Sequence, residues 1–180
     1  MKVLLCEDTD WLLSEEAFLI YAPCMFHPTY EKYKTKMEDC LTDSSVKVFV
    51  IEYQGRKTGM MVLNLSEADA EIIGIAVSAN ARRKGIGKQM IQRVMESENL
   101  ESVKAQTDDD SIGFYRKCGF SEERTGIEYD GQRYHQDVER DKKKDALCLE
   151  NKISQSFYQI LVAVLRLVVL SGQKVESDTF

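Results

Sequence analysis

Residues 71–88 read EIIGIAVSANARRKGIGK, and this stretch decides the fold. After Glu71, the residues up to Val77 are nearly all apolar, which predicts a buried strand covered on both faces. The segment Arg82 to Lys88 then combines basic residues with two glycines at the start of an amphipathic helix. Helix-start amides have no partner inside the helix and carry a positive dipole, so this segment predicts a site for an anion such as pyrophosphate.

Two other phosphate-binding motifs are excluded by spacing. A Walker A loop needs Ser or Thr after its Gly-Lys pair, and Gln89 follows Gly87-Lys88. A dinucleotide fingerprint needs Gly or Ala where Met90 stands. We therefore expect the basic, glycine-bearing segment to be an anion site of another kind, and a turn with solvated charges is the alternative.

The residues before this stretch predict helices and a hairpin. A short strand at 2–5 precedes one helix that begins at Asp8 or Thr9 and extends to Ile20. Pro23 and Pro28 break the chain before a second helix at 29–41. Strands at 46–53 and 59–65, joined by a turn at 54–57, form the hairpin.

The residues after this stretch complete a mixed sheet. A strand at 102–107 precedes a short helix at 111–118, which Gly119 ends, and a final hairpin turns at Asp130-Gly131. Strands that alternate with helices after a hairpin predict a mixed α/β sheet with helices on both faces.

Composition excludes several functional classes. The net charge of -6 argues against a general nucleic-acid binder, which needs a basic surface. The five cysteines are scattered without a CxxC pair, so we expect no metal site and a reducing, cytoplasmic location. The N-terminal residues lack the long apolar run of a signal peptide.

A second motif indicates a protein family. Phe114-Tyr115-x-x-x-Gly119-Phe120 lies in the short helix beyond the glycine-rich segment. It resembles the later coenzyme-A helix of the GNAT superfamily of N-acetyltransferases. Arg82-x-x-Gly85-x-Gly87 is similar to the pyrophosphate segment of that family, usually written Gln/Arg-x-x-Gly-x-Gly/Ala. The resemblance covers roughly residues 46–138.

The resemblance implies a fold and a cofactor. The sheet should be mixed but mostly antiparallel, and its fourth and fifth strands should splay apart to admit acetyl-CoA. The implied reaction moves the acetyl group to a primary amine, of a small molecule or of a protein, by direct attack and without a metal. The residues implied in cofactor binding are Ile75, Ala76, Val77, Arg82, Arg83, Lys84, Gly85, Ile86, Gly87, Lys88, Asp108 and Tyr115, with the acetyl carbonyl meeting an amide at about Val77.

Two side chains are candidates for proton transfer. Tyr115 matches the family tyrosine that protonates the departing thiolate, although it can also be a core aromatic residue. Glu71 has the spacing of the base in the histone-acetyltransferase branch, although an exposed carboxylate at a strand start is the alternative. Asp108 stands where relatives carry an asparagine that contacts pantetheine, but an N-capping role is also open.

The acceptor site is the least defined part. His27 can line it, and so can several aromatic side chains, for which core packing is the alternative: Trp11, Tyr30, Tyr33, Tyr129 and Tyr134. A non-catalytic module that binds acyl-CoA as a sensor or for assembly is the alternative function; Tyr115 favours the enzyme.

The C-terminal part is expected to be separate. We predict an acetyltransferase domain at 1–144 and an extension at 145–180 with an apolar segment at 157–170. That segment is shorter than a membrane-spanning helix and contains Arg166, so stable membrane insertion is not expected. Packing on the domain or in a homodimer is the main interpretation, and a peripheral membrane contact is the alternative.

Overall fold

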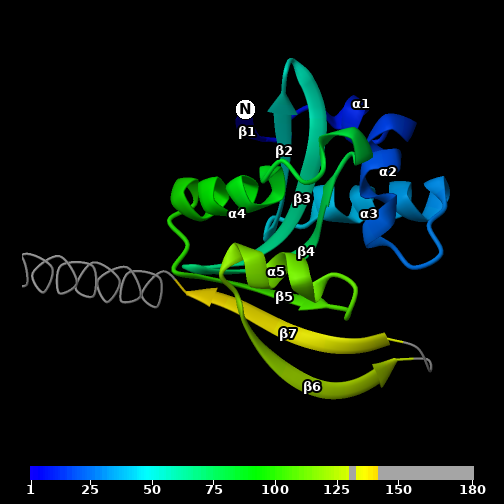
Figure 1. Cartoon of the computed structure of the whole chain (residues 1–180). Helices are drawn as coiled ribbons and strands as arrows, with labels where there is room; N and C mark the ends of the chain where they lie inside the picture. The colour runs from blue at the N-terminus through cyan, green and yellow to red at the C-terminus, as the bar shows by residue number, and fades with distance from the viewer. Residues whose placement is uncertain (130–132, 142–180) are drawn as a thin grey trace, which may run out of the picture. The chain divides into compact units, whose positions relative to one another are not determined.

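The protein forms one mixed sheet with helices on both faces (Figure 1). This computed structural model describes residues 1–129 and 133–141, and for 123–129 and 133–137 it describes the backbone alone. The strands are β1 (Lys2–Leu5), β2 (Val46–Tyr53), β3 (Arg56–Ser66), β4 (Asp69–Val77), β5 (Ser102–Thr107), β6 (Ser121–Tyr129) and β7 (Arg133–Asp141). The helices are α1 (Thr9–Leu12), α2 (Glu15–Tyr21), α3 (Tyr30–Thr42), α4 (Ile86–Ser97) and α5 (Ile112–Cys118), with 3₁₀ turns η1 (Ala22–Cys24) and η2 (Ala79–Ala81).

The strand order confirms the predicted sheet. It runs β1-β2-β3-β4-β5-β7-β6, so the chain proceeds stepwise across the sheet until the final hairpin. In the described chain, β4 and β5 form the one parallel pair, and every other neighbouring pair is antiparallel. Helix α4 connects the two parallel strands, as a crossover between such strands requires. The predicted turn at Asp130-Gly131 lies outside the described residues.

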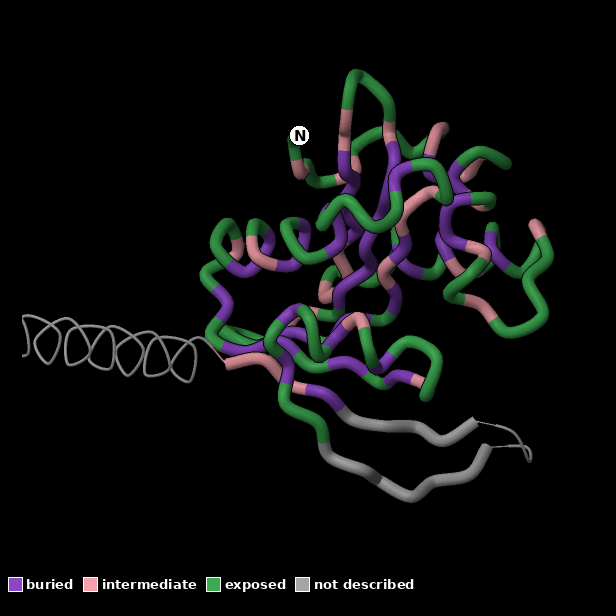
Figure 2. Tube along the Cα trace, viewed as in Figure 1, coloured by how far each residue is buried: buried purple, intermediate pink, exposed green. Residues whose placement is uncertain are grey.

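Alternation along the central strands separates two cores. In β2 and β3, Phe49, Met61 and Leu63 pack with α4 and α5, whereas Val48 and Met60 face the first three helices. Side chains on a strand point to opposite faces in turn, so both faces of these strands are covered. The buried centre of the sheet in Figure 2 reflects this arrangement.

A bulge in β4 changes this alternation. Val62 pairs with Gly74 and Leu63 with Ile72, which leaves Ile73 as the extra residue on β4. Ala70 and Ile72 pack in the α4–α5 core, whereas Ala76 packs in the α2–α3 core. The prediction of a strand covered on both faces throughout was therefore wrong, because buried residues alternate with exposed ones such as Glu71 and Ile73.

The N-terminal helix is two helices rather than one. Ser14 ends the first and begins the second: its hydroxyl donates to the Trp11 carbonyl at 2.6 Å and accepts from the Ala17 amide at 3.3 Å. Ser, with its preference for helix N-caps, explains the break. The break at Pro23 is confirmed, because Pro23 lies in η1, and α3 begins after the Thr29 cap.

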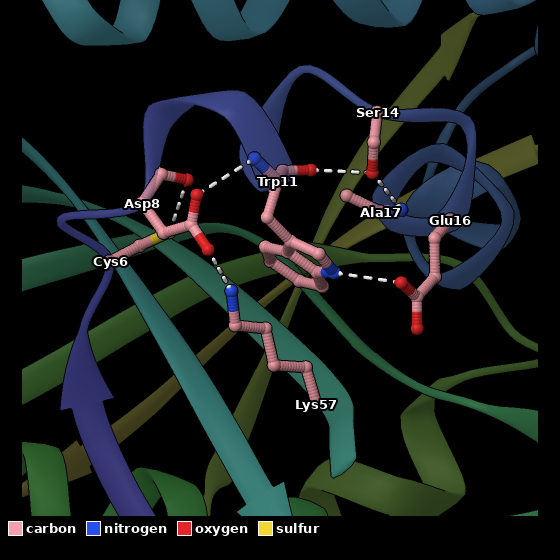
Figure 3. Close-up of polar contacts among 7 residues, drawn as sticks. All are labelled: Cys6, Asp8, Trp11, Ser14, Glu16, Ala17 and Lys57. Atoms are coloured by element: carbon pink, nitrogen blue, oxygen red, sulfur yellow. Dashed lines mark hydrogen bonds and ion pairs between the residues drawn. The ribbon is translucent and has the colours of Figure 1, made fainter.

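The break at Ser14 builds a surface cluster that we call the α1 corner, consisting of Cys6, Asp8, Trp11, Ser14, Glu16 and Lys57 (Figure 3). Asp8 accepts from the Trp11 amide at 3.0 Å and from Lys57 Nζ at 2.5 Å. Trp11 Nε1 donates to Glu16 at 3.2 Å, and the Lys57 ammonium lies 4.5 Å from the centre of the indole ring. These contacts attach α1 to the start of β3.

The turn of the first hairpin is shorter than predicted. The turn between β2 and β3 contains two residues, Gln54 and Gly55, both with positive φ, and β3 therefore begins at Arg56. The described unit ends at Asp141, and the predicted extension at 145–180 lies outside the described residues. Within the described ranges, no helix has both the length and the apolarity needed to cross a membrane.

Candidate active site

The site begins where β4 and β5 separate. Their pairing runs from Asp69–Ser102 to Ile72–Ala105 and stops there. Beyond Ala105, β5 continues to Thr107 beside β7, while β4 continues to Val77 beside β3. The predicted splay of these strands is confirmed, and it leaves the second half of β4 with one edge open.

Alternation in the β3–β4 ladder identifies the groups on this open edge. The Ser78 amide donates to the Thr58 carbonyl at 2.8 Å, so residues 78, 76 and 74 direct their hydrogen bonds toward β3. Ile75 and Val77 consequently direct their amide and carbonyl groups toward the gap. Two contacts agree with this orientation: the Ile75 carbonyl accepts from the Cys24 thiol at 3.2 Å, and the Val77 carbonyl accepts from Arg82 Nε at 2.9 Å.

The N-terminus of α4 lies immediately after this edge in the chain. Gly85 is its N-cap residue, with φ of 74°, and makes no side-chain capping bond. The preceding Arg83 also has positive φ, 61°. Such left-handed residues before a helix turn successive amides outward, which makes a concave site for anions. Glycine is required at position 85 for its positive φ and not for lack of space, since an added Cβ would meet nothing closer than 3.8 Å.

Basic side chains surround these amides. Arg82, Arg83, Lys84 and Lys88 are all exposed, whereas the Ile86 side chain is buried and offers the site its backbone alone. Arg82 is fixed by its bond to Val77, and the Lys84 ammonium lies 5.6 Å from the centre of the Tyr53 ring. The segment thus presents amides and positive charge at one end of the open edge.

Gly87 joins this segment to the second motif. A Cβ on Gly87 would lie 2.9 Å from Cε2 of Phe114, which is closer than real Cβ atoms come to other atoms. The start of α4 therefore packs directly against the aromatic ring of α5. This contact explains why the glycine-rich segment and the Phe114-Tyr115 motif occur together: each shapes the position of the other helix.

Tyr115 is held rigidly beside Phe114. It is buried, and its ring makes edge-to-face contacts with Phe114 and Phe120, each at 5.1 Å between ring centres. Burial raises the pKa of its hydroxyl, and the neighbouring Cys24, Cys118 and Asp108 raise it further. Tyr115 is therefore a neutral phenol at physiological pH, able to donate a proton.

The two predicted carboxylates differ in their surroundings. Glu71 is the third residue of β4 rather than its first, and it is exposed. Because Ala70 and Ile72 point into the α4–α5 core, Glu71 points to the α2–α3 face. Asp108 accepts a hydrogen bond from the Ser111 amide at 2.9 Å just before α5, so it performs the capping role.

Most candidates for the acceptor side have structural partners. Tyr30 and Tyr33 donate hydrogen bonds to the carbonyls of Leu13 and Leu12, and Trp11 belongs to the α1 corner. His27 is exposed, has φ of 46°, and its ring lies 4.1 Å from that of Phe26. The side chains of Tyr129, Tyr134 and His135 lie outside the described residues.

Sequence reasoning missed two residues at the open edge. The Cys24 thiol donates to the Ile75 carbonyl, although Cys24 is an exposed residue of η1, and loss of solvent around the sulfur raises the pKa of the thiol to about 11. Tyr21, just before η1, places its hydroxyl against Gly74 of β4. No motif marked either residue, since a contact across 51 residues of sequence leaves no local pattern.

Together, an open strand edge and a basic helix start define a site for an extended ligand with an anionic end. In the part of the chain that the structure describes, no group of three or more His, Cys, Asp and Glu residues is arranged to hold a metal ion.

Comparison with known proteins places this site in a family. The model of the acetyltransferase (GNAT) family matches residues 14–120, so the chain belongs to the GNAT family of acetyltransferases. Its activity is accordingly the transfer of an acetyl group to an amine. No curated protein matches the chain in sequence.

Solved structures share the fold at low sequence identity. An acetyltransferase from Bacillus subtilis in complex with CoA superposes with a TM-score of 0.56 at 18% identity, covering 78% of this chain and 97% of its own. Dodecameric spermidine N-acetyltransferase from Vibrio cholerae gives 0.57 at 18%, covering 79% and 94%. GCN5 from Tetrahymena gives 0.57 at 18%, covering 76% and 94%. At such identities, the likeness concerns the fold.

Proposed function

We propose that the chain binds acetyl-CoA along the open edge of β4 and transfers the acetyl group to a primary amine. One observation carries this proposal. The open edge of β4, with the amides of Ile75 and Val77, is followed in the chain by the start of α4, which has no side-chain cap. A pantetheine arm carries amide groups that pair with a strand edge, and pyrophosphate suits outward amides among basic side chains.

The residues of the site fit this cofactor at both ends. Arg83, Lys84 and Lys88 would face the phosphates, with the amides of Gly85 to Lys88 beneath them. Ile75 and Val77 would pair with the pantetheine, and Ala76 would fix the strand by packing in the α2–α3 core. Asp108 would act on the cofactor indirectly, by holding the start of α5.

The chemistry of this chain is positioning and proton transfer. The acetyl group of the bound cofactor is the electrophile, and the amine attacks it directly. A β4 amide, at about Val77, stabilises the developing oxyanion. Tyr115 Oη donates its proton to the departing thiolate, for which a neutral phenol is needed. Glu71, on the α2–α3 face, accepts the amine proton directly or through water.

The acceptor is proposed as a class, with spermidine as its first probe. Spermidine is the substrate named for the Vibrio cholerae protein, and it carries primary amines. A peptide amine remains the second probe. We also propose assembly into at least a homodimer, since that same protein is dodecameric. A cytoplasmic location is supported by the four described cysteines, which are all free thiols.

Thermal unfolding with and without acetyl-CoA tests the cofactor, with ATP and NAD as controls. A ligand at about 100 times its dissociation constant adds roughly 2.7 kcal/mol, or about 5–10 °C in midpoint for a domain of this size. A rise with acetyl-CoA alone is expected. No shift at millimolar acetyl-CoA would overturn the proposal.

A matched pair of variants locates the phosphate site. Arg83→Gln should weaken binding about fivefold, as expected for the loss of one hydrogen bond worth about 1 kcal/mol. Arg93→Gln removes the same charge from an exposed position on α4, about 10 Å or more beyond the start of that helix. Arg93→Gln should leave binding unchanged, and equal effects of the two variants would reject the assigned phosphate site.

A further inference from the structure

Tyr21 occupies an unusual position between the two halves of the site. It is the last residue of α2, its side chain is fully buried, and its ring lies 6.0 Å from that of Tyr33. A Cβ on Gly74 would overlap the Tyr21 hydroxyl. The hydroxyl therefore rests directly on the β4 backbone, one residue beyond the bulge at Ile73 and one before Ile75.

The Tyr21 hydroxyl has no hydrogen-bond partner among the described residues. A buried polar group left in this way costs about 1–3 kcal/mol, and native proteins rarely keep one without a reason. Tyr33 of α3 shows the usual arrangement in the same core: it is also fully buried, but its hydroxyl donates to the Leu12 carbonyl at 2.6 Å. The missing partner is thus a property of Tyr21 and not of this core.

The surroundings of this hydroxyl are those of the reacting end of the site. Cys24, three residues along the chain, contacts the carbonyl of Ile75, the residue after Gly74. Cys24 and Tyr115 both lie close enough to raise the pKa of Tyr21 further above the value that burial gives it. The Tyr21 phenol and the Cys24 thiol thus lie against neighbouring residues of β4, Gly74 and Ile75, and both are neutral at physiological pH.

The bulge decides which substrate the hydroxyl faces. Gly74 and Ala76 point to the α2–α3 face, as Glu71 does before the bulge, whereas the Ile75 and Val77 amides run along the gap assigned to the cofactor. Tyr21 consequently approaches β4 from the side opposite α4. Because the cofactor is proposed to occupy the gap along the open edge, this side remains for the incoming amine.

We propose that Tyr21 is an acceptor-binding residue, whose hydroxyl accepts a hydrogen bond from the N–H of the attacking amine. The inference rests on the proposed function and adds a residue to its site. A neutral phenol oxygen holds an amine without protonating it, so the nitrogen lone pair stays available for attack. Tyr21 itself forms no covalent bond in the reaction.

Tyr21 is fully buried in the unliganded protein, and the η1 turn that follows it bonds to β4 through Cys24. Cys24 is bound to β4 by a thiol, which is a poor hydrogen-bond donor. The pantetheine proposed to pair with Ile75 competes for the same carbonyl. Cofactor binding therefore loosens the turn and gives the Tyr21 hydroxyl access to the amine.

The test compares Tyr21→Phe with Tyr33→Phe, two buried tyrosines that lose the same atom. In unliganded protein, Tyr21→Phe should leave the unfolding midpoint unchanged or raise it, because it removes an unsatisfied group. Tyr33→Phe should lower the midpoint by several degrees, because it leaves the Leu12 carbonyl without its donor. A fall for Tyr21→Phe equal to that for Tyr33→Phe would show that the hydroxyl has a structural partner, and would overturn the proposal.

The second measurement uses a bisubstrate probe, a coenzyme A thioether of N-propylacetamide, whose N–H occupies the position of the transferred amine. Wild type should bind this probe roughly three- to tenfold more tightly than acetyl-CoA, the worth of one net hydrogen bond. Tyr21→Phe should lose this preference while its affinity for acetyl-CoA is kept, and Tyr33→Phe should retain the preference. Equal affinities in wild type, or a preference that survives Tyr21→Phe, would overturn the inference. Failure of wild type to bind acetyl-CoA would instead reject the proposed function.

Discussion

Trp11 and Tyr21 are both large aromatic side chains that pack beside the sheet, but the polar atoms of Trp11 have hydrogen-bond partners and the hydroxyl of Tyr21 has none among the described residues. At the α1 corner, the Trp11 amide bonds to Asp8 and the indole nitrogen to Glu16 (Figure 3). At the open edge of β4, the Tyr21 hydroxyl has no partner among the described residues, and the N-cap of α4 supplies none to the helix. We infer that the first region contributes stability, whereas the second keeps its hydrogen-bonding groups for ligands. The variants below test this division.

The largest effect is expected at Tyr115. Tyr115→Phe removes the proposed proton donor but keeps the ring between Phe114 and Phe120. Loss of a general acid typically costs 10²- to 10⁴-fold, so kcat should fall by about that factor. Release of coenzyme A measures the rate, and the thermal shift with acetyl-CoA should persist. Unchanged turnover would remove Tyr115 from the chemistry.

The next effect concerns Cys24. Burial raises the pKa of its thiol to about 11, so only about 10⁻⁴ of it is thiolate at pH 7. Alkylation of Cys24 by N-ethylmaleimide, followed by peptide mass spectrometry, should accelerate about tenfold per pH unit from 7 to 10. A rate that levels off near pH 9 would mean that the thiol is not held against β4.

A smaller effect, on stability, is expected where α4 meets α5. Gly87→Val places side-chain atoms where the Phe114 ring lies, and such overpacking costs about 1–3 kcal/mol. The unfolding midpoint should fall by roughly 3–10 °C, and the shift with acetyl-CoA should shrink.

Gly113→Ala is the control for this variant. A Cβ there would meet nothing within 4 Å, and alanine stabilises a helix by about 0.5–1 kcal/mol relative to glycine. Its midpoint should therefore rise slightly. A similar fall for both variants would contradict the packing argument.

The smallest effect is expected at the α1 corner. Hydrogen bonds from Lys57 and the Trp11 amide lower the pKa of the exposed Asp8 carboxyl. A lowered pKa contributes stability that is present above the ordinary value near 3.9 and is lost as the pH falls through the folded value. Asp8→Asn should lower the midpoint by a few degrees at most at pH 7, and the difference should shrink as the pH falls below the ordinary pKa of an aspartate. A change in acetyl-CoA binding would contradict the separation of the two regions.

Local signals allowed much of the fold to be predicted. The strands and the longer helices follow from hydrophobic periodicity, and the splay of β4 and β5 was implied by family resemblance. The break at Ser14 was missed because apolar residues continue through it, and one capping hydroxyl decides the matter. The bulge was missed because an apolar run shows no alternation from which an extra residue can be recognised.

The candidate site could be predicted on its cofactor side but not on its acceptor side. Arg82 to Lys88 form a contiguous segment, so their spacing alone predicted an anion site. Tyr21 and Cys24 reach Gly74 and Ile75 by tertiary packing, and nothing near them in sequence indicates that contact. Asp108 showed the opposite difficulty, because capping and ligand contact suit the same residue type. Its bond to the Ser111 amide shows the first, and the contact with the cofactor stays a prediction.

The extra residue in β4 forms a bulge, and the pairing of β4 with β3 continues on both sides of it. Deletion of Ile73 would remove the bulge, because the pairs Val62–Gly74 and Leu63–Ile72 on either side of it would then follow each other directly. Ile72 would keep its place in the α4–α5 core, and Glu71 would stay on the α2–α3 face. The strand therefore tolerates a change of one residue in length at the bulge, because no buried side chain has to change face.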